Sequence, residues 1–238
     1  MKEQQDNTER KKFVAVKAAP LIQNGMVAGM GTGSTIAFLI EELARRMHEE
    51  GFTFVAVPTS FQSRILCMNF GIPVRDMQDT ARLDLAIDGA DEVDPDLNLI
   101  KGGGASHTRE KIVAAMAKEF VVVVDESKLV DNLGANFAIP VEVLPTSLAF
   151  VLRTIRDMGG APALRTGSGK DGPVVTDNGM LILDVRFPPA TDLRAVDLTL
   201  HGVPGVIETG LFFGMAQKVL VGCGSPGNLT LRTLTRRS

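Results

Sequence analysis

The chain has no tryptophan and no tyrosine among its 238 residues, so phenylalanine is the only large aromatic residue that it contains. We therefore expect a core of aliphatic residues with phenylalanine and methionine, and a ligand that is not held by stacking on large rings. The two cysteines, Cys67 and Cys223, match neither a zinc-site nor a CxxC spacing. We interpret both as reduced thiols of a cytoplasmic protein.

Long apolar runs and an excess of positive charge are also missing. No apolar stretch approaches the roughly 18 residues that span a bilayer, and residues 1–12 lack the apolar segment of a signal peptide. The formal net charge is −3, which provides no basic face for nucleic acid. A hydrophobic content of 45% is typical of a folded globular protein. We therefore expect neither a membrane nor a nucleic acid as partner.

A glycine-rich turn, GMGTGST, joins an apolar strand predicted over 26–30 to an amphipathic helix predicted over 34–49. This order aims backbone N–H groups and the positive end of a helix dipole at an anion. The turn lacks the lysine of a P-loop, and Ser34 stands where a dinucleotide fingerprint has its third glycine. The strand predicted over 54–57 is followed by no acid for a ribose hydroxyl. The pattern favours a single phosphate over a nicotinamide cofactor.

The segment 88–110 combines three acids, Asp88, Asp91 and Glu110, with Lys101 and a run of three glycines. Asp88 directly follows a buried strand predicted over 83–87. Since ligands bind outside the carboxyl ends of parallel strands, we expect DGAD to lie beside the GTGST turn if the two strands are neighbours.

These residue types suit proton transfer next to a carbonyl group. Glu110 falls near the start of a helix predicted over 108–118, where the dipole favours a carboxylate that accepts protons. Lys101 and the N–H groups of the following glycines would stabilise the enediolate anion that such an abstraction creates. Asp88 and Asp91 would shuttle protons among hydroxyl oxygens, and Lys128 with the GTGST turn would hold a phosphate.

A metal site is the main alternative for these acids. The stretch DGADEVDPD is rich in oxygen ligands, but it lacks the spacing of an EF-hand loop, and no histidine pair supports zinc. We favour a site without metal. His107 is interpreted as a capping or solvated residue, and His48 and His201 as surface residues.

Strands alternating with helices over 1–130 predict an α/β protein with a parallel sheet. The later segments predict a βαββαβ arrangement, namely strand 139–143, helix 145–158, strand 163–165, a hairpin of 174–176 with 180–186 after a turn-rich loop at 167–172, helix 191–201 and strand 205–211. We predict a catalytic domain over 1–132 and 207–238, and a small α+β domain over 133–206. Further expectations are a helix over 7–24 that Pro20 kinks or shortens, and a short strand around 73–75.

A set of motifs resembles the ribose-5-phosphate isomerase family of type A, namely GTGST (31–35), DGADEVD (88–94), KGGGA (101–105), TREK (108–111), DESK (125–128), PVEV (140–143) and VVTDNGMLILDV (174–185). The motifs keep the family's order and spacing, and the resemblance runs from Lys11 to about Val221. Residues 228–238 look like a tail outside it. The resemblance implies a Rossmann-like domain that carries a smaller ferredoxin-like α+β domain.

The resemblance also implies the interconversion of D-ribose 5-phosphate and D-ribulose 5-phosphate, without metal or organic cofactor, by a homodimer or tetramer. Glu110 corresponds to the base, Asp88 and Asp91 to the acids, and Lys101 to the residue that steadies the enediolate. The substrate-binding positions that it implies are Lys11, Thr32, Gly33, Ser34, Thr35, Gly89, Ala90, Gly102, Gly103, Gly104 and Lys128.

Two other functions fit the sequence less well. A sugar-phosphate sensor that regulates transcription would need a DNA-binding segment, and only about 25 residues precede the first predicted strand, too few for a helix-turn-helix domain. A nicotinamide-dependent dehydrogenase is disfavoured by the broken fingerprint.

Overall fold

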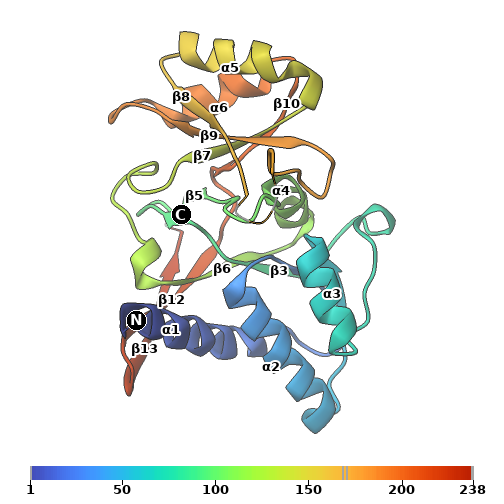
Figure 1. Ribbon diagram of the computed structural model, residues 1–238. Coiled ribbons are helices and arrows are strands. Elements are labelled where there is room, and N and C mark those ends of the chain that lie inside the picture. Colours follow the sequence, from blue (N-terminus) through green and yellow to red (C-terminus); the bar gives the residue numbers. More distant parts are fainter. Residues whose placement is uncertain (1, 168, 170, 237–238) are drawn as a thin grey trace.

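The main sheet combines four strands from residues 27–125 with two strands from residues 218–235. The structure, a computed structural model, describes residues 2–167, 169 and 171–236. The main sheet has six strands in the order β13-β12-β6-β3-β1-β2 (Figure 1). All neighbours are parallel except β12 and β13. The strands are β1 (Val27–Met30), β2 (Val55–Pro58), β3 (Leu85–Asp88), β6 (Phe120–Asp125), β12 (Lys218–Ser225) and β13 (Asn228–Thr235).

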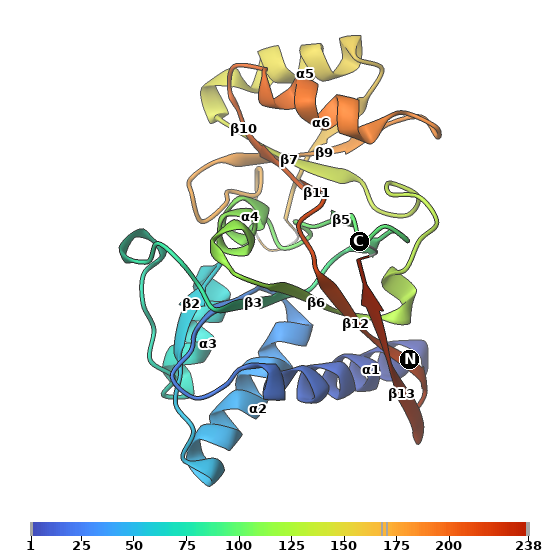
Figure 2. The same ribbon diagram turned by 180° about the vertical axis from the view of Figure 1, so that it is seen from behind.

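Helices cover both faces of this sheet. The strand β6 alternates accordingly, with Val121 and Val123 packing in the core beneath α1 and α2, and Val122 and Val124 packing in the core beneath α4. The two opposed faces can be followed in Figures 1 and 2. Both faces are apolar because a mostly parallel sheet is buried on both sides. The helices are α1 (Lys2–Ala18), α2 (Ser34–Glu50), α3 (Phe61–Asn69) and α4 (His107–Met116).

The first helix differs from its expected range. It begins at Lys2 and not at residue 7, and it ends at Ala18, where a 3₁₀ turn, η1 (Ala19–Leu21), follows. Pro20 lies in the first part of that turn, where its missing N–H is tolerated. The prediction that Pro20 shortens the helix is therefore confirmed.

A second, four-stranded antiparallel sheet with the order β10-β7-β9-β8 carries α5 and α6 on one face (Figure 1). Its elements follow one another as β7-α5-β8-β9-α6-β10, the βαββαβ arrangement that was predicted. Their bounds are β7 (Ile139–Val143), α5 (Leu148–Asp157), β8 (Ala161–Leu164), β9 (Leu181–Arg186), α6 (Leu193–His201) and β10 (Val206–Thr209). The exact domain boundaries remain a prediction.

Three local expectations are wrong. Residues 174–176 form no strand, and the expected hairpin is reduced to an antiparallel bridge between Val175 and Leu181. The strand expected around 73–75 is reduced to one bridge between Ala56 and Val74. The expected tail forms β13, which pairs along its whole length with β12. Ser168 and Lys170 of the expected 167–172 loop lie outside the described residues.

A third sheet joins the two larger ones and was not predicted. It has the order β11-β5-β4 and consists of β4 (Glu92–Val93), β5 (Leu99–Ile100) and β11 (Leu211–Phe212). Lys101 follows β5 directly, so this small sheet fixes the position of the Lys101 backbone. The remaining 3₁₀ turns are η2 (Met77–Asp79), η3 (Glu126–Lys128) and η4 (Pro145–Ser147). Within the described residues, no helix has the length and apolar character to cross a membrane.

Candidate active site

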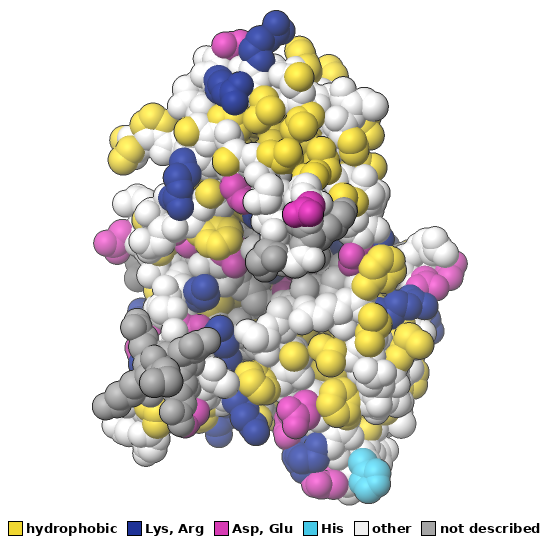
Figure 3. Space-filling view, viewed as in Figure 1, with side chains coloured by type: hydrophobic (Ala, Val, Ile, Leu, Met, Phe, Trp, Pro, Cys, Tyr) yellow, Lys and Arg dark blue, Asp and Glu magenta, His cyan; other side chains and the backbone are white. Residues whose placement is uncertain are grey.

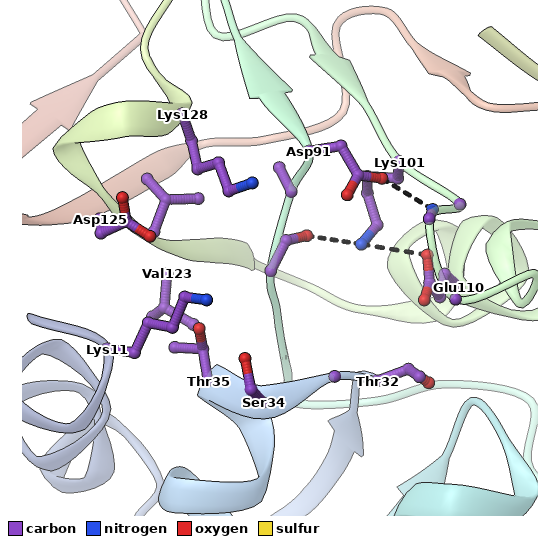
Figure 4. A pocket seen from close by; sticks show the side chains of 17 residues that line it. Lys11, Thr32, Ser34, Thr35, Asp91, Lys101, Glu110, Val123, Asp125 and Lys128 are labelled. Atoms are coloured by element: carbon purple, nitrogen blue, oxygen red, sulfur yellow. Dashed lines mark hydrogen bonds and ion pairs between the residues drawn. The ribbon is translucent and has the colours of Figure 1, made fainter. Parts of the chain in front are cut away.

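A cavity of about 170 Å³ opens at the carboxyl ends of β1, β3 and β6 (Figure 4). This is the edge at which ligands of parallel α/β sheets bind. The cavity is lined by Lys11, Thr32, Gly33, Ser34, Thr35, Gly89, Ala90, Asp91, Lys101, Gly102, Gly103, Gly104, Glu110, Val123, Val124, Asp125 and Lys128.

The glycine turn after β1 packs against Asp88 at the end of β3, its neighbouring strand. Asp88 Oδ1 accepts hydrogen bonds from the backbone N–H of Thr32, at 3.1 Å, and of Gly89, at 2.7 Å. A Cβ on Gly31 would lie 2.0 Å from that oxygen, so only glycine fits there. The expectation that DGAD lies beside the GTGST turn is confirmed.

Lys101 is the centre of the site and is only 3% exposed. Its Nζ donates a 2.5 Å hydrogen bond to the Gly89 carbonyl, and it lies 3.0 Å from Asp88 Oδ2 and 3.1 Å from Glu110 Oε2. Burial by itself lowers the pKa of this ammonium, but the charges of Asp88 and Glu110 outweigh that effect and raise the pKa. Lys101 therefore stays charged.

Asp88 is the unusual acid of the cluster. Burial raises its pKa to about 7, the charge of Glu110 adds to the effect, and the Lys101 ammonium opposes it. Although Oδ2 is close to Lys101, no well-directed hydrogen bond to this oxygen is found among the described residues. Asp88 is therefore able to hold or release a proton near neutral pH.

Glu110 lies in the first turn of α4 and is 5% exposed. Its Oε1 accepts a 2.5 Å hydrogen bond from Ser106 Oγ, and Ser106 is the residue that precedes the helix. Its Oε2, like Oδ2 of Asp88, receives no well-directed hydrogen bond from the part of the chain that is described. Glu110 also lines the cavity, so its carboxylate borders the space that a ligand would occupy.

Asp91 contacts the glycine run directly at the wall of the cavity. Asp91 Oδ2 accepts a 2.8 Å hydrogen bond from the Gly103 N–H, and burial raises the pKa of the carboxyl group. Gly102 has a φ of +112°, which disfavours residues with a side chain. A Cβ there would also lie 2.7 Å from His107 Nδ1, so Gly102 is required both by its backbone and by its neighbour.

Two lysines line the end of the cavity that lies away from Lys101 and Glu110. Figure 4 shows Lys11, from α1, and Lys128, from η3, pointing toward the space above Ser34 and Thr35. The N-terminus of α2 begins at Ser34, after Gly33 with a φ of +100°. A helix dipole, two hydroxyls and two ammonium groups thus gather where an anion would be favoured.

The cavity brings together every site residue that was predicted, with Asp88 joined to it through Lys101. Their roles stay predictions.

Sequence reasoning missed Ser106, whose hydroxyl donates a hydrogen bond to Glu110. It was wrong about His107, which is fully buried, with Nε2 3.3 Å from the Glu208 carbonyl. His48 and His201 are exposed, as expected. Among the described residues, no group of His, Cys, Asp or Glu is arranged to hold a metal ion.

Residues 55–225 match the family model of ribose 5-phosphate isomerase A, also described as phosphoriboisomerase A. The chain belongs to the ribose 5-phosphate isomerase A family. The match to the family model covers more than half of the chain, and it confirms the resemblance that the motifs indicated.

Relatives in this family are similar over nearly their full length. The ribose-5-phosphate isomerase A of Thermosynechococcus vestitus is 53% identical over 215 residues, which are 90% of this chain and 91% of the relative. That of Methanothermobacter thermautotrophicus is 51% identical over 212 residues, covering 89% and 93%.

Solved structures of the family share the fold. Ribose 5-phosphate isomerase A from Methanocaldococcus jannaschii has a TM-score of 0.89 at 46% identity, covering 96% of this chain and 99% of its own. A D-ribose-5-phosphate isomerase in complex with phospho-erythronic acid has a TM-score of 0.90 at 41% identity, covering 96% and 98%. The predicted α/β fold with its smaller α+β part is confirmed.

Proposed function

We propose that this chain interconverts D-ribose 5-phosphate and D-ribulose 5-phosphate. The observation that carries the proposal is the buried Lys101 ammonium between the carboxylates of Asp88 and Glu110, at the wall of a polar cavity. The family supports it, as does the relative that binds phospho-erythronic acid, a four-carbon sugar acid with a phosphate.

The proposed reaction moves one proton between neighbouring carbons. Glu110 removes the proton from C2 of the open-chain aldose, and the electron pair moves into the C1–C2 bond and onto O1. The resulting enediolate is stabilised by the Lys101 ammonium, which binds it more strongly than it binds the neutral substrate. Glu110 then returns the proton to C1, which leaves the carbonyl at C2. The aldehyde carbon is reduced and the alcohol carbon is oxidised, so the reaction requires no external oxidant.

The two aspartates serve the oxygen atoms in this proposal. Asp88, whose pKa burial raises to about 7, carries the proton that leaves O2 and protonates O1. Asp91, with an elevated pKa and a hydrogen bond from Gly103, assists ring opening of the bound furanose. The remaining glycine N–H groups approach the same oxygens.

The phosphate is placed at the other end of the cavity. Lys11, Lys128, Ser34 and Thr35 surround that end, and the N-terminus of α2 adds its dipole. Contacts so far from C1 and C2 hold the reacting carbons beside Glu110, which is how remote binding accelerates a chemical step.

The wider setting is part of the same proposal. The reaction belongs to the non-oxidative branch of the pentose phosphate pathway, in the cytoplasm.

We propose that the chain forms a homodimer, or a tetramer, as in the family. Hydrophobic side chains gather on the face shown in Figure 3, toward the end of the molecule that carries α5. Phe150 on that helix is 44% exposed, and such side chains are suited to a subunit contact.

The test is an assay of the purified chain with D-ribose 5-phosphate alone, in which ketose formation is followed. We expect ketose without added cofactor and an unchanged rate after treatment with EDTA. Loss of activity that a divalent ion restores would favour the metal alternative.

Two further results would decide for the other functions. Binding of D-ribose 5-phosphate without any ketose would favour a sensor. A change in absorbance that depends on a nicotinamide cofactor would favour a dehydrogenase. Either result would contradict the isomerase proposal.

A further inference from the structure

One side chain of the second sheet reaches the glycine run of the site. Arg165 directly follows β8, and its backbone N–H donates to the Ile182 carbonyl at 2.9 Å, which continues the pairing with β9. Its Nε and Nη2 pair with the two carboxylate oxygens of Asp184 on β9, at 2.9 and 2.5 Å. Its Nη1 donates to the carbonyls of Gly102, at 2.7 Å, and Gly103, at 3.2 Å.

The peptide between Gly102 and Gly103 is consequently held from both ends. Its carbonyl accepts from Arg165, and its N–H donates to Asp91 Oδ2 at 2.8 Å. A trans peptide is planar with these two groups on opposite sides, so the two bonds together define its orientation. Hydrogen bonds arranged in series polarise one another. The Arg165 guanidinium therefore polarises the peptide whose N–H donates to Asp91, and so strengthens that hydrogen bond.

We propose that Arg165 is a positioning residue of the isomerisation, which acts by holding the glycine run against Asp91 and beside Lys101. The inference rests on the proposed function. Arg165 does not line the cavity that holds the candidate catalytic groups. It acts through the glycine backbone, which has little rigidity of its own because glycine is conformationally permissive.

The pairing with Asp184 explains why an arginine occupies this position. Two of its nitrogens are engaged by one carboxylate, and the third remains directed at the carbonyls. A guanidinium group holds its donors in a planar fork, whereas a lysine has one point charge on a flexible stem. The side chain is 13% exposed, and its bonds to Asp184 and to the Gly102 carbonyl are partly buried.

The test compares Arg165→Met and Arg165→Lys with Arg186→Met. Arg186 is an exposed arginine on β9 whose side chain donates to the Asn136 carbonyl at 3.4 Å. It contributes the same charge to the same region of the second sheet. We expect kcat of Arg165→Met to fall roughly 10- to 100-fold, because small misplacements of reacting groups have effects of this size. KM for D-ribose 5-phosphate should change by less than about 3-fold, because the phosphate contacts lie elsewhere.

Arg165→Lys should recover part of kcat, and Arg186→Met should match the unmodified chain. In addition, amide hydrogen exchange of the peptide that contains residues 102–104 should accelerate in Arg165→Met and not in Arg186→Met. Unchanged kcat with unchanged exchange in a folded Arg165→Met variant would overturn the inference.

The experiment also separates this inference from the proposed function. If the unmodified chain forms no ketose, the isomerase proposal fails, and hydrogen exchange still reports whether Arg165 holds the glycine run. If the unmodified chain is active and Arg165→Met raises only KM, the residue is a substrate contact and the positioning role is wrong.

Discussion

Two carboxylates and one ammonium group share the buried centre of the site. Asp88 Oδ2 and Glu110 Oε2 lie 3.0 and 3.1 Å from Lys101 Nζ, so one cation serves two acids. A buried cluster with an uncompensated charge is unfavourable, and protonation of one acid removes that charge. Burial raises the pKa of Asp88 to about 7, so Asp88 is the group that takes the proton. In the proposed mechanism, Glu110 is the group that accepts the proton from carbon.

We expect Glu110→Gln to lower kcat by roughly 10²- to 10⁴-fold, the usual contribution of a general base. The amide keeps the shape of the side chain and its contact with Ser106, but it cannot accept the C2 proton. Binding should therefore survive, which titration of the variant with phospho-erythronic acid would measure. Ketose formation from D-ribose 5-phosphate reports the rate.

Glu41→Gln is the matched control for this change, because Glu41 is an exposed glutamate on α2 that does not line the cavity. It should leave both kcat and binding unchanged. A Glu110→Gln variant that kept a kcat close to that of Glu41→Gln would show that another group is the base.

Lys101→Met should lower kcat by roughly 10²- to 10³-fold, the effect of losing a donor to a developing oxyanion. KM should rise much less, since the ammonium helps most when the negative charge has formed. Steady-state kinetics over a range of D-ribose 5-phosphate concentrations separates the two constants. An effect confined to KM would make Lys101 an anchor for the substrate and not a catalytic residue.

At this scale the sequence motifs predicted the acids, Lys101, Lys128 and the glycines of the cavity, because each belongs to a short run with its own chemistry. Lys11 belongs to no such run and was expected only from the family resemblance. Ser106 was missed because its contact with Glu110 fits no capping-box spacing. The error at His107 has a different cause. A polar residue at a helix start is ordinarily solvated, but the Glu208 carbonyl and Gly102 enclose this one, and both contacts come from other elements.

Among the elements, α4 is attached to the second sheet through Glu142 of β7. This carboxylate is 1% exposed and accepts from Thr108 Oγ1 of α4. It also accepts from Thr176 Oγ1 at 2.5 Å and from Asn178 Nδ2 at 3.1 Å. These bonds hold Thr176 and Asn178 in a loop next to β7, where a strand had been expected over 174–176. They also hold the helix that carries Glu110.

Glu142→Gln should destabilise the protein by about 1–3 kcal/mol, because the amide nitrogen would face the donors that the carboxylate now satisfies. For a chain of this size, the melting temperature should fall by roughly 2–4 °C per kcal/mol. Thermal unfolding followed by circular dichroism measures the change.

The same Glu41→Gln variant is the control for Glu142→Gln, and its melting temperature should equal that of the unmodified chain. Equal melting temperatures for all three proteins would mean that Glu142 is not a structural link between α4 and the second sheet.

The long elements were predicted well because their apolar periodicity is strong, as in β6, whose six residues are all buried. The strands β4 and β5 were not predicted, because two residues are too few to show a period, and β11 begins at the last residue of the strand expected over 205–211. Yet this small sheet leads into Lys101, whose N–H donates to the Gly210 carbonyl at 2.9 Å. The position of the central lysine thus depends on pairings between residues distant in sequence.

For the molecule as a whole, the elevated pKa of Asp88 links the stability of the fold to pH. In the unfolded chain this acid releases its proton near its usual pKa of 3.8, whereas in the fold it keeps the proton until about pH 7. The folded state therefore binds more protons between these values. By linkage, the contribution of Asp88 to the free energy of unfolding decreases as the pH rises through this window.

We expect Asp88→Asn to remove this dependence, since the amide does not titrate. The free energy of unfolding of the variant minus that of the unmodified chain should rise from about pH 4 to about pH 7, by at most about 1.4 kcal/mol per pH unit. Above pH 7 the difference should be constant, because Asp88 is then ionised in both states. Other acids and His107, whose pKa burial lowers, are present in both proteins, so contributions that the substitution leaves unchanged cancel. Urea unfolding at a series of pH values measures the difference, and a difference that stays constant from pH 4 to pH 7 would show that Asp88 ionises normally in the folded protein.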